Sequence, residues 1–285
     1  MRDIKLVAIL LIFMTWSCKE EAKKATPTTT ILKGEVIFRP TSDTLLLLRA
    51  TENASQENKM IGIPIVDGKF NYEFSSEEDL AYQLIFKEEY DKGNAKPIIF
   101  FPTEGSVSFK LHNVKDFSSN EVTGGPLNST YKEFTSKILN PFNNAVISIY
   151  KEFEAVTYQD RHSTAFNTIA SKLRAASQEE KMAIYKQMNA LKEQGLDKST
   201  LGKEVDAKYE KLEMKYFDDK YDFITANPSV VSYYLVIADL MRVTDRKQPS
   251  NELIFKAFNT LKEKFPEHAY TTLGTTLMNE INERK

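Results

Sequence analysis

The sequence has few of the residues that most often carry redox and metal chemistry. It contains one cysteine, Cys18, and three histidines, His112, His162 and His268, in 285 residues. A lone thiol forms no disulfide within the chain and cannot resolve a mixed disulfide, which excludes dithiol oxidoreductase chemistry. The histidines are far apart, and none has a partner four residues away, as in helical zinc motifs. We therefore expect no metal and no cofactor.

An excess of charge of one sign is also absent, and so are the common catalytic motifs. The chain has 38 Lys and Arg against 40 Asp and Glu. Proteins that bind nucleic acid usually present a clustered basic surface, so we expect no nucleic-acid partner. The sequence has neither a Gly-rich phosphate loop nor a Gly-x-Ser-x-Gly elbow. These absences favour a protein that is not an enzyme.

The N-terminus has the organisation of a secretory signal peptide. Arg2 and Lys5 precede an apolar stretch over residues 6–14, and the small residue Ser17 follows. The stretch is shorter than the about 20 residues of a transmembrane helix but suits the core of a signal peptide. We expect residues 1–17 to be removed on export. The alternatives are an uncleaved anchor and an ordinary secretory signal in which the next residue, a cysteine, is incidental.

Ser17 and Cys18 resemble the end of a bacterial lipobox. Thr15 and Trp16 depart from that pattern, which usually has leucine three residues before the cysteine. The resemblance implies that Cys18 is acylated and becomes the first residue of the mature protein. Because each buried CH₂ contributes about 0.8 kcal/mol, two or more acyl chains hold a protein stably on a membrane. We therefore expect a membrane partner, reached through lipid on Cys18.

Residues 18–30 are polar and contain proline and threonine, so they predict a flexible tether. Its first charged residues, Lys19, Glu20 and Glu21, resemble the export signal of surface-exposed lipoproteins in Bacteroidota. The alternative is a solvated linker without such a signal. We expect a lipid-anchored protein of the outer membrane that faces the periplasm or the cell surface.

Residues 31–125 have the pattern of short strands. The apolar segments are residues 31–38, 44–49, 60–66, 69–74, 81–86, 97–101 and 106–111. Asp67 and Gly68 lie between two of these segments, and this dipeptide is typical of a tight hairpin turn. Several short strands with turn signals between them, and no helical pattern, predict an antiparallel β-sandwich or barrel.

Residues 126–285 change to a helical period. We expect a kink or a break at Asn140–Pro141 and a helix end at Gly195. Asn227–Pro228 predicts a cap followed by proline at the first helical position. Short connections favour antiparallel neighbours in an α-helical bundle. The fold class expected is therefore α+β, with a β domain at residues 31–125 followed by a helical domain at residues 126–285.

The order of the turns and strand edges resembles a known protein family. The landmarks are residues 32–36, 67–70, 99–105, 122–128 and 227–229. They are similar to the N-terminal domain of unknown function, and the helical segment after it, of thiol:disulfide interchange lipoproteins of Bacteroidota. The resemblance covers nearly all of the mature chain. Those proteins continue into a thioredoxin-like domain with a Cys-x-x-Cys site, and this chain has no cysteine after Cys18. The resemblance thus implies an accessory portion without the catalytic one.

Aromatic residues at the start of the helical half form the candidate surface for a ligand or a partner. They are Tyr131, Phe134, Phe142, Tyr150 and Phe153. At these spacings they can line a groove, or they can face the core of the bundle or the β domain.

The sequence therefore favours a non-catalytic binding or adaptor module of the cell envelope. The alternatives are a protein that captures a peptide, a glycan or a small molecule between its two domains, and an enzyme whose site is assembled only by folding. A concave aromatic cleft between the domains would favour ligand capture, and an exposed apolar patch would favour a protein partner. A buried cluster of titratable groups would favour the enzyme.

Overall fold

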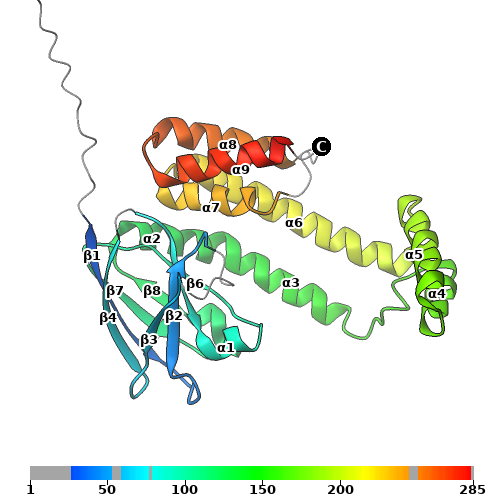
Figure 1. Cartoon of the computed structure of the whole chain (residues 1–285), viewed down its shortest axis with the longest axis horizontal. Coiled ribbons are helices and arrows are strands. Elements are labelled where there is room, and N and C mark those ends of the chain that lie inside the picture. The colour runs from blue at the N-terminus through cyan, green and yellow to red at the C-terminus, as the bar shows by residue number, and fades with distance from the viewer. Residues whose placement is uncertain (1–26, 53–58, 77–78, 244–249, 284–285) are drawn as a thin grey trace, which may run out of the picture.

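The computed structural model describes residues 27–52, 59–76, 79–243 and 250–283. Two four-stranded sheets occupy the N-terminal half and helices occupy the C-terminal half, so the chain is of the mixed α and β class (Figure 1). The predicted signal peptide, Cys18 and the tether up to residue 26 lie outside the described residues. The first strand begins at Thr28, within the segment predicted as tether.

The first sheet has the strand order β4-β1-β7-β8 and the second has the order β3-β2-β5-β6. The first sheet comprises β1 (Thr28–Val36), β4 (Lys69–Ser76), β7 (Gly105–Leu111) and β8 (Glu121–Thr123). The second comprises β2 (Thr44–Arg49), β3 (Ile61–Pro64), β5 (Tyr82–Phe86) and β6 (Ile98–Phe100). The strand pairs are antiparallel except for β1 and β7, which are parallel. The prediction of a purely antiparallel arrangement is wrong at this pair, because β7 reaches β1 by a crossover from β6 of the second sheet and not by a hairpin.

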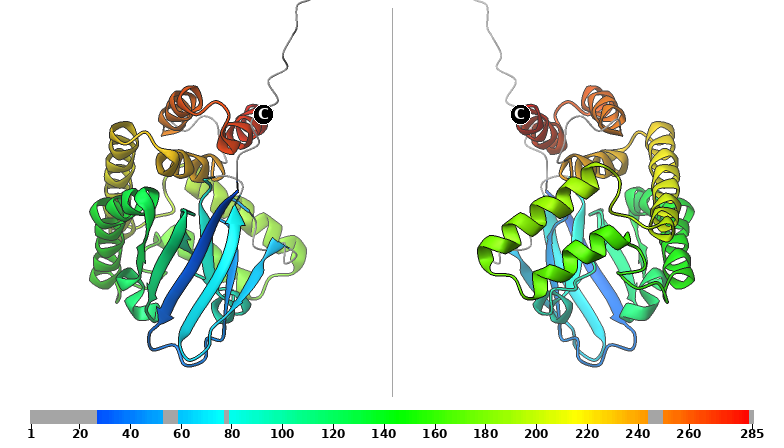
Figure 2. Two further views of the ribbon diagram at one scale, coloured as in Figure 1. Left: turned by 90° about the vertical axis from the view of Figure 1, so that its left-hand side faces the viewer. Right: turned by 90° about the vertical axis from the view of Figure 1, so that its right-hand side faces the viewer.

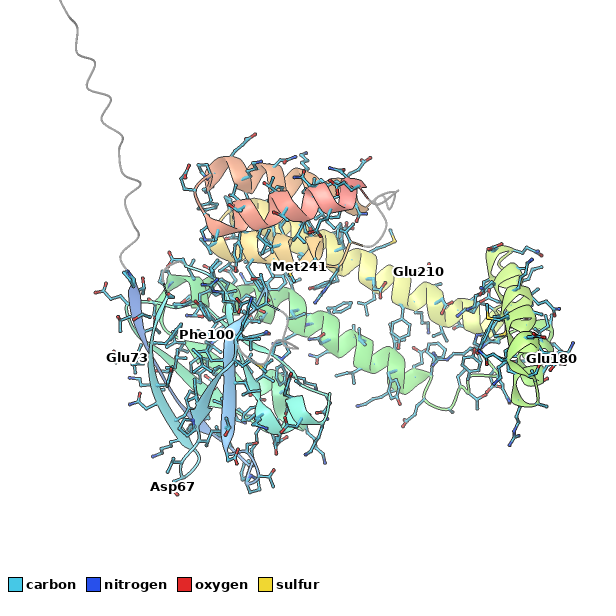
Figure 3. All side chains as sticks on the ribbon, viewed as in Figure 1. Asp67, Glu73, Phe100, Glu180, Glu210 and Met241 are labelled. Carbon is cyan, nitrogen blue, oxygen red and sulfur yellow. The ribbon has the colours of Figure 1, made fainter. Side chains whose placement is uncertain are left out.

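The two sheets bury their facing side chains in one core. Leu32 of β1, Leu45 of β2 and Phe100 of β6 are all fully buried, and Phe100 points to the inside in Figure 3. The predicted tight turn is confirmed, since Asp67 and Gly68 have φ values of 50° and 70° and Val66 pairs with Lys69 across them. The strands that it joins do not form a paired hairpin, because β3 and β4 belong to different sheets. Positive φ at both central positions is what such a turn requires.

The helical half comprises helices of different lengths. They are α2 (Gly125–Phe134), α3 (Asn140–Glu152), α4 (Thr164–Ser171), α5 (Gln178–Glu193), α6 (Thr200–Ala226), α7 (Val230–Leu240), α8 (Ser250–Lys264) and α9 (Ala269–Glu283). A short α1 (Lys87–Asp91) follows β5, and 3₁₀ turns occupy η2 (Val114–Ser119) and η4 (Lys172–Arg174). The hydroxyl oxygens of Ser163, Ser177, Ser199 and Ser229 accept main-chain N–H groups at the starts of α4, α5, α6 and α7. These caps satisfy donors that a helix start leaves open.

The helices differ from the sequence-based expectation at two places, before Pro141 and at the start of α7. The helix continues to Pro141 through η3 (Thr135–Leu139), a π-helical segment, instead of breaking before the proline. A π turn adds a residue to the helical ladder and so accommodates a ring that an α turn would exclude. The prediction that Asn227–Pro228 caps α7 is wrong, because Ser229 is the cap and its side chain accepts the N–H of Ser232.

The helices bury their apolar residues in two places. The sheet core continues into α2 and α7–α9 across the boundary predicted at residues 125 and 126, and the hydroxyl of Tyr270 on α9 accepts the N–H of Ala81 at 2.8 Å. The helices α3 and α6 project side by side from this body and carry α4 and α5 at their far end, an extension that we call the arm (Figures 1 and 2). Phe166, Ile184 and Met188 form a separate small core there.

Candidate functional site

A pocket of about 170 Å³ lies where the two sheets end. It is bordered by β6 and β8, the last strands of their sheets, and it is covered by α2, the π-helical segment and the start of α3. We call it the edge pocket. Its lining residues are Pro97, Ile98, Ile99, Phe117, Ser118, Asn120, Glu121, Val122, Asn128, Tyr131, Lys132, Thr135, Leu139, Asn140 and Asn143.

The buried side chain of Asn128 holds α2 against the edge of β6. Its Oδ1 accepts the N–H of Phe101 at 2.8 Å, and its Nδ2 donates to the carbonyl of Phe101 at 2.7 Å. Nδ2 also donates to the carbonyl of Gly124 at 2.6 Å. The side-chain amide thus pairs with both main-chain groups of Phe101, as a neighbouring strand would. This pairing closes the edge of the second sheet at Phe101.

The main-chain groups of Ile99 point the same way as those of Phe101. Along a strand, successive residues direct their N–H and C=O groups to opposite edges, so residues two apart share an edge. Because Phe101 bonds to Asn128 and not to β5, Ile99 also faces away from β5. No hydrogen bond outside the strand ladders reaches Ile99 within the part of the chain that the structure describes. Ile99 therefore presents one donor and one acceptor to the edge pocket.

Val122 of β8 has the corresponding position on the other sheet. The N–H of Ile37 bonds to the carbonyl of Leu111, so Leu111 and Phe109 direct their main-chain groups toward β1. Val122 lies opposite Phe109, which makes this a pair without mutual hydrogen bonds. The main-chain groups of Val122 therefore face away from β7. Both sheets thus end at the edge pocket with one unpaired strand position each.

The side chains of the edge pocket are mostly neutral. Glu121 and Lys132 are its two charged lining residues, and they have opposite signs. Burial raises the pKa of the Tyr131 hydroxyl well above its usual value of about 10, so this hydroxyl stays protonated. Asn120 accepts the N–H of His112 through Oδ1, while its buried Nδ2 has no partner among the described residues. The pocket suits an uncharged ligand that supplies hydrogen-bond acceptors.

The five aromatic residues predicted from the sequence do not form one groove. Tyr131 lines the edge pocket, and its ring lies 6.1 Å from that of Phe134, which is buried in the core. Phe142 stacks on Tyr216 of α6 at 4.3 Å, and Phe153 is buried at the far end of the arm. Tyr150 is 61% exposed. One of the five therefore contributes to the pocket, and the others pack in the core or lie on the arm.

Exposed apolar side chains gather along the arm. They are Ile147, Tyr150, Tyr158, Met182, Tyr185, Leu196 and Met214, each at least 47% exposed. Asn143 of the edge pocket is followed by Ile147 and Tyr150 at intervals of four and three residues, which places these three on one face of α3. Leu139, the last residue of η3, precedes Asn143 by four residues. The wall of the edge pocket thus continues onto the exposed face of the arm.

A buried cluster of titratable groups joins α6 to α7. Lys220 Nζ lies 2.6 Å from one carboxylate oxygen of Asp239, and the hydroxyl of Tyr221 donates to the other at 2.8 Å. Burial lowers the pKa of Lys220 and outweighs the attraction of Asp239, while burial raises the pKa of the neighbouring Tyr216 to about 12. None of these residues lines the edge pocket. Because Lys220 and both oxygens of Asp239 already have partners, the cluster is a structural link between two helices.

Sequence reasoning missed the residues that build the edge pocket. Asn128 follows a Gly-Gly-Pro turn, and nothing in its neighbourhood indicates that it pairs with Phe101, 27 positions earlier. Whether the main-chain groups of Ile99 and Val122 lack a partner strand depends on which strands lie at the ends of the sheets. The short segment that contains Val122 was not recognised as a strand.

No protein-family model matches the chain, and no curated protein matches its sequence. In the described ranges no group of three or more His, Cys, Asp and Glu side chains could hold a metal ion. No helix of the described part is both long enough and apolar enough to cross a membrane.

Proposed function

We propose that this chain is a lipid-anchored lipoprotein of the outer membrane that captures a ligand in its edge pocket without catalysing a reaction. The observation that carries the proposal is the pocket itself, to which both halves of the chain contribute. Strands β6 and β8 supply one side, and α2 and α3 supply the other. Ligand sites occur preferentially where two structural units meet, and a few polar groups in an apolar wall fix the orientation of the ligand.

The lipid anchor rests on the signal peptide and Cys18. Because β1 begins at Thr28, residues 19–27 form the connection between the cysteine and the folded body. At about 3.3–3.6 Å per extended residue, this connection reaches roughly 35 Å. The body would therefore stay close to the membrane surface, with the edge pocket open to molecules in the same layer of the envelope.

The absence of catalysis in this proposal rests on the chemistry of the lining. The neutral amide and hydroxyl groups of Ser118, Asn120, Thr135, Asn140 and Asn143 form hydrogen bonds but do not change their protonation state near neutral pH. The buried ionisable pairs, Arg39 with Glu89 and Lys220 with Asp239, do not line the edge pocket. General acid–base catalysis needs a titratable group within reach of the reacting atoms. Among the residues that line the edge pocket, Glu121 is the one with a carboxylate.

The first prediction concerns the anchor. Replacing Cys18 by alanine removes the atom that carries the lipid, so the protein should move from the membrane fraction to the soluble fraction. The release is expected because each lost acyl chain removes about 0.8 kcal/mol per buried CH₂. Incorporation of labelled fatty acid should fall to background, because the acceptor sulfur is no longer present. Fractionation and labelling measure both effects. Unchanged membrane retention of an unlabelled wild-type protein would contradict the anchor.

The second prediction concerns the pocket. Asn143 is exposed and lines the mouth of the edge pocket, so Asn143→Trp should obstruct ligand entry and reduce captured ligand at least about tenfold, or about 1.4 kcal/mol. Captured material is measured by mass spectrometry after crosslinking in native envelopes and purification of the tagged protein. Asn144→Trp is the matched control, because Asn144 is exposed on the same helix but does not line the pocket. Equal capture by both variants would contradict the proposal.

A second candidate function is an adaptor that binds another protein through the arm. The observation that favours it is the set of exposed apolar residues along the arm, among them Tyr150 and Met214, which are 61% and 68% exposed. Exposed apolar surface of this kind often marks a protein interface. In the crosslinking experiment, Tyr150→Ala would then abolish capture, and Asn143→Trp would leave it intact.

A further inference from the structure

We infer that the ligand of the edge pocket is a polypeptide segment in extended conformation, which adds as a short strand to β6 at Ile99. This inference rests on the proposed function, since it names the chemical class of the ligand. Strand addition uses main-chain hydrogen bonds for affinity and side-chain pockets for selectivity. Three features of the pocket favour this ligand over a glycan or another small molecule.

The first feature is the paired donor and acceptor of Ile99. The N–H and C=O of one strand residue are spaced to bond with the C=O and N–H of one residue on a neighbouring strand. At β6 these groups face the edge pocket. An extended peptide satisfies such a pair with its own main chain, whatever its sequence. A sugar hydroxyl has no fixed equivalent of this spacing.

The second feature is Asn128. Its side-chain amide already bonds to the N–H and C=O of Phe101, two residues along the same edge. An amide therefore fits against this edge at the position next to Ile99. A bound peptide would extend the row of amides that Asn128 begins.

The third feature is the size of the pocket. Its volume of about 170 Å³ is close to that of an engineered cavity of about 150 Å³ that holds benzene. It is smaller than the roughly 300–1,000 Å³ of sites for drug-sized ligands. The pocket therefore accepts one side chain, and the apolar Ile98, Phe117 and Leu139 in its wall favour an uncharged apolar one. The rest of the ligand would lie outside the pocket, where Ile147 and Tyr150 continue its wall.

The orientation of the strand edge is tested first by amide hydrogen exchange, measured by NMR on the full chain in detergent micelles. The N–H groups of Ile98 and Phe100 bond to β5 and should exchange at least a hundredfold more slowly than that of Ile99. Equal protection of Ile99 would show that its edge is already paired and would overturn the inference. This measurement needs no variant and no ligand.

Binding is tested with a displayed library of random seven-residue peptides, selected on the same full chain. We expect enriched sequences whose binding falls at least tenfold against Ile99→Pro, which lacks the N–H that faces the pocket. Proline is tolerated on a strand edge where its nitrogen faces away from the ladder, so this variant should still fold. Ile99→Val keeps the main-chain groups and serves as the matched control.

A scan of the peptide main chain then decides the binding mode without altering the protein. Methylation of the peptide nitrogen that donates to the carbonyl of Ile99 should reduce affinity at least tenfold. Methylation of the nitrogens on either side of it, which face away from β6, should change affinity by less than about twofold. This alternation is the signature of strand addition. Loss at consecutive positions, loss at none, or no enriched peptide would overturn the inference. If Asn143→Trp still blocks capture from envelopes in that case, the proposed function stands and only the peptide class is wrong.

Discussion

Replacing Asp239 by alanine is expected to lower the free energy of unfolding by about 3–5 kcal/mol, because it leaves the ammonium of Lys220 buried without a counter-charge. The side chains of Lys220 and Asp239 are 6% and 13% exposed, and their charged atoms lie 2.6 Å apart. The substitution also removes the acceptor of the Tyr221 hydroxyl. Urea unfolding followed by circular dichroism measures the change through the midpoint at constant slope.

The matched control for this prediction is Asp219→Ala. Asp219 lies on α6, the long helix that also carries Lys220, and it pairs with Lys215 at 2.6 Å. The side chains of Asp219 and Lys215 are 43% and 70% exposed. An exposed pair of this kind contributes about 0–1 kcal/mol. Similar losses for Asp239→Ala and Asp219→Ala would show that the Lys220 pair is solvated in solution. Adding Lys220→Met to Asp239→Ala should restore much of the stability, because it removes the unpaired charge.

Replacing Asn128 by alanine is expected to lower the free energy of unfolding by about 2–5 kcal/mol. The side chain supplies three hydrogen bonds to main-chain groups of Phe101 and Gly124. Without it, the buried N–H and C=O of Phe101 lose their partners, and each unsatisfied group costs about 1–3 kcal/mol. Helix α2 also loses its attachment to the edge of β6, so ligand capture should fall together with stability. The same unfolding measurement checks the first effect.

Asn143→Ala is the control for Asn128, since both residues line the edge pocket and Asn143 is exposed. We expect a change within about 0.5 kcal/mol, as is usual for surface substitutions. The variant Asn128→Asp distinguishes the contributions of the two hydrogen bonds to Phe101. A carboxylate still accepts the N–H of Phe101 but cannot donate to its carbonyl. A loss for Asn128→Ala as small as that for Asn143→Ala would mean that water replaces the amide at this edge.

The elements of the fold could be read from the sequence where local signals decide them. Asp67–Gly68 fixes the tight turn between β3 and β4 through positive φ angles, and the strand at Thr44–Arg49 has the predicted limits. Helix α5 has a complete capping box formed by Ser177 and Glu180, and it ends before Gly195 as expected. In each case the signal and its effect lie within a few residues, so local propensity and turn chemistry are sufficient.

The arrangement of those elements could not be read in this way. The parallel pairing of β1 and β7 joins strands more than 70 residues apart, and no local pattern distinguishes it from an antiparallel pairing. The same holds for the candidate site. Tyr131 was expected at a binding surface, and it lines the edge pocket. Helical periodicity also placed Phe134 and Phe153 among the candidates for that surface, although both are buried. Burial depends on what packs against a helix, which the sequence of the helix alone does not specify.

The hydrogen bond between Ala81 and Tyr270 has a consequence for the order in which the protein is made. It joins residues 189 positions apart, and Tyr270 belongs to the same core as the first strands. At about 5–20 residues per second, a ribosome needs roughly 10–40 s to travel between these two codons. During that interval the strands already synthesised lack the helices α7 to α9, which belong to the same core. The topology thus delays closure of the core until synthesis of the chain is nearly finished, as the proposed export in an unfolded state would require.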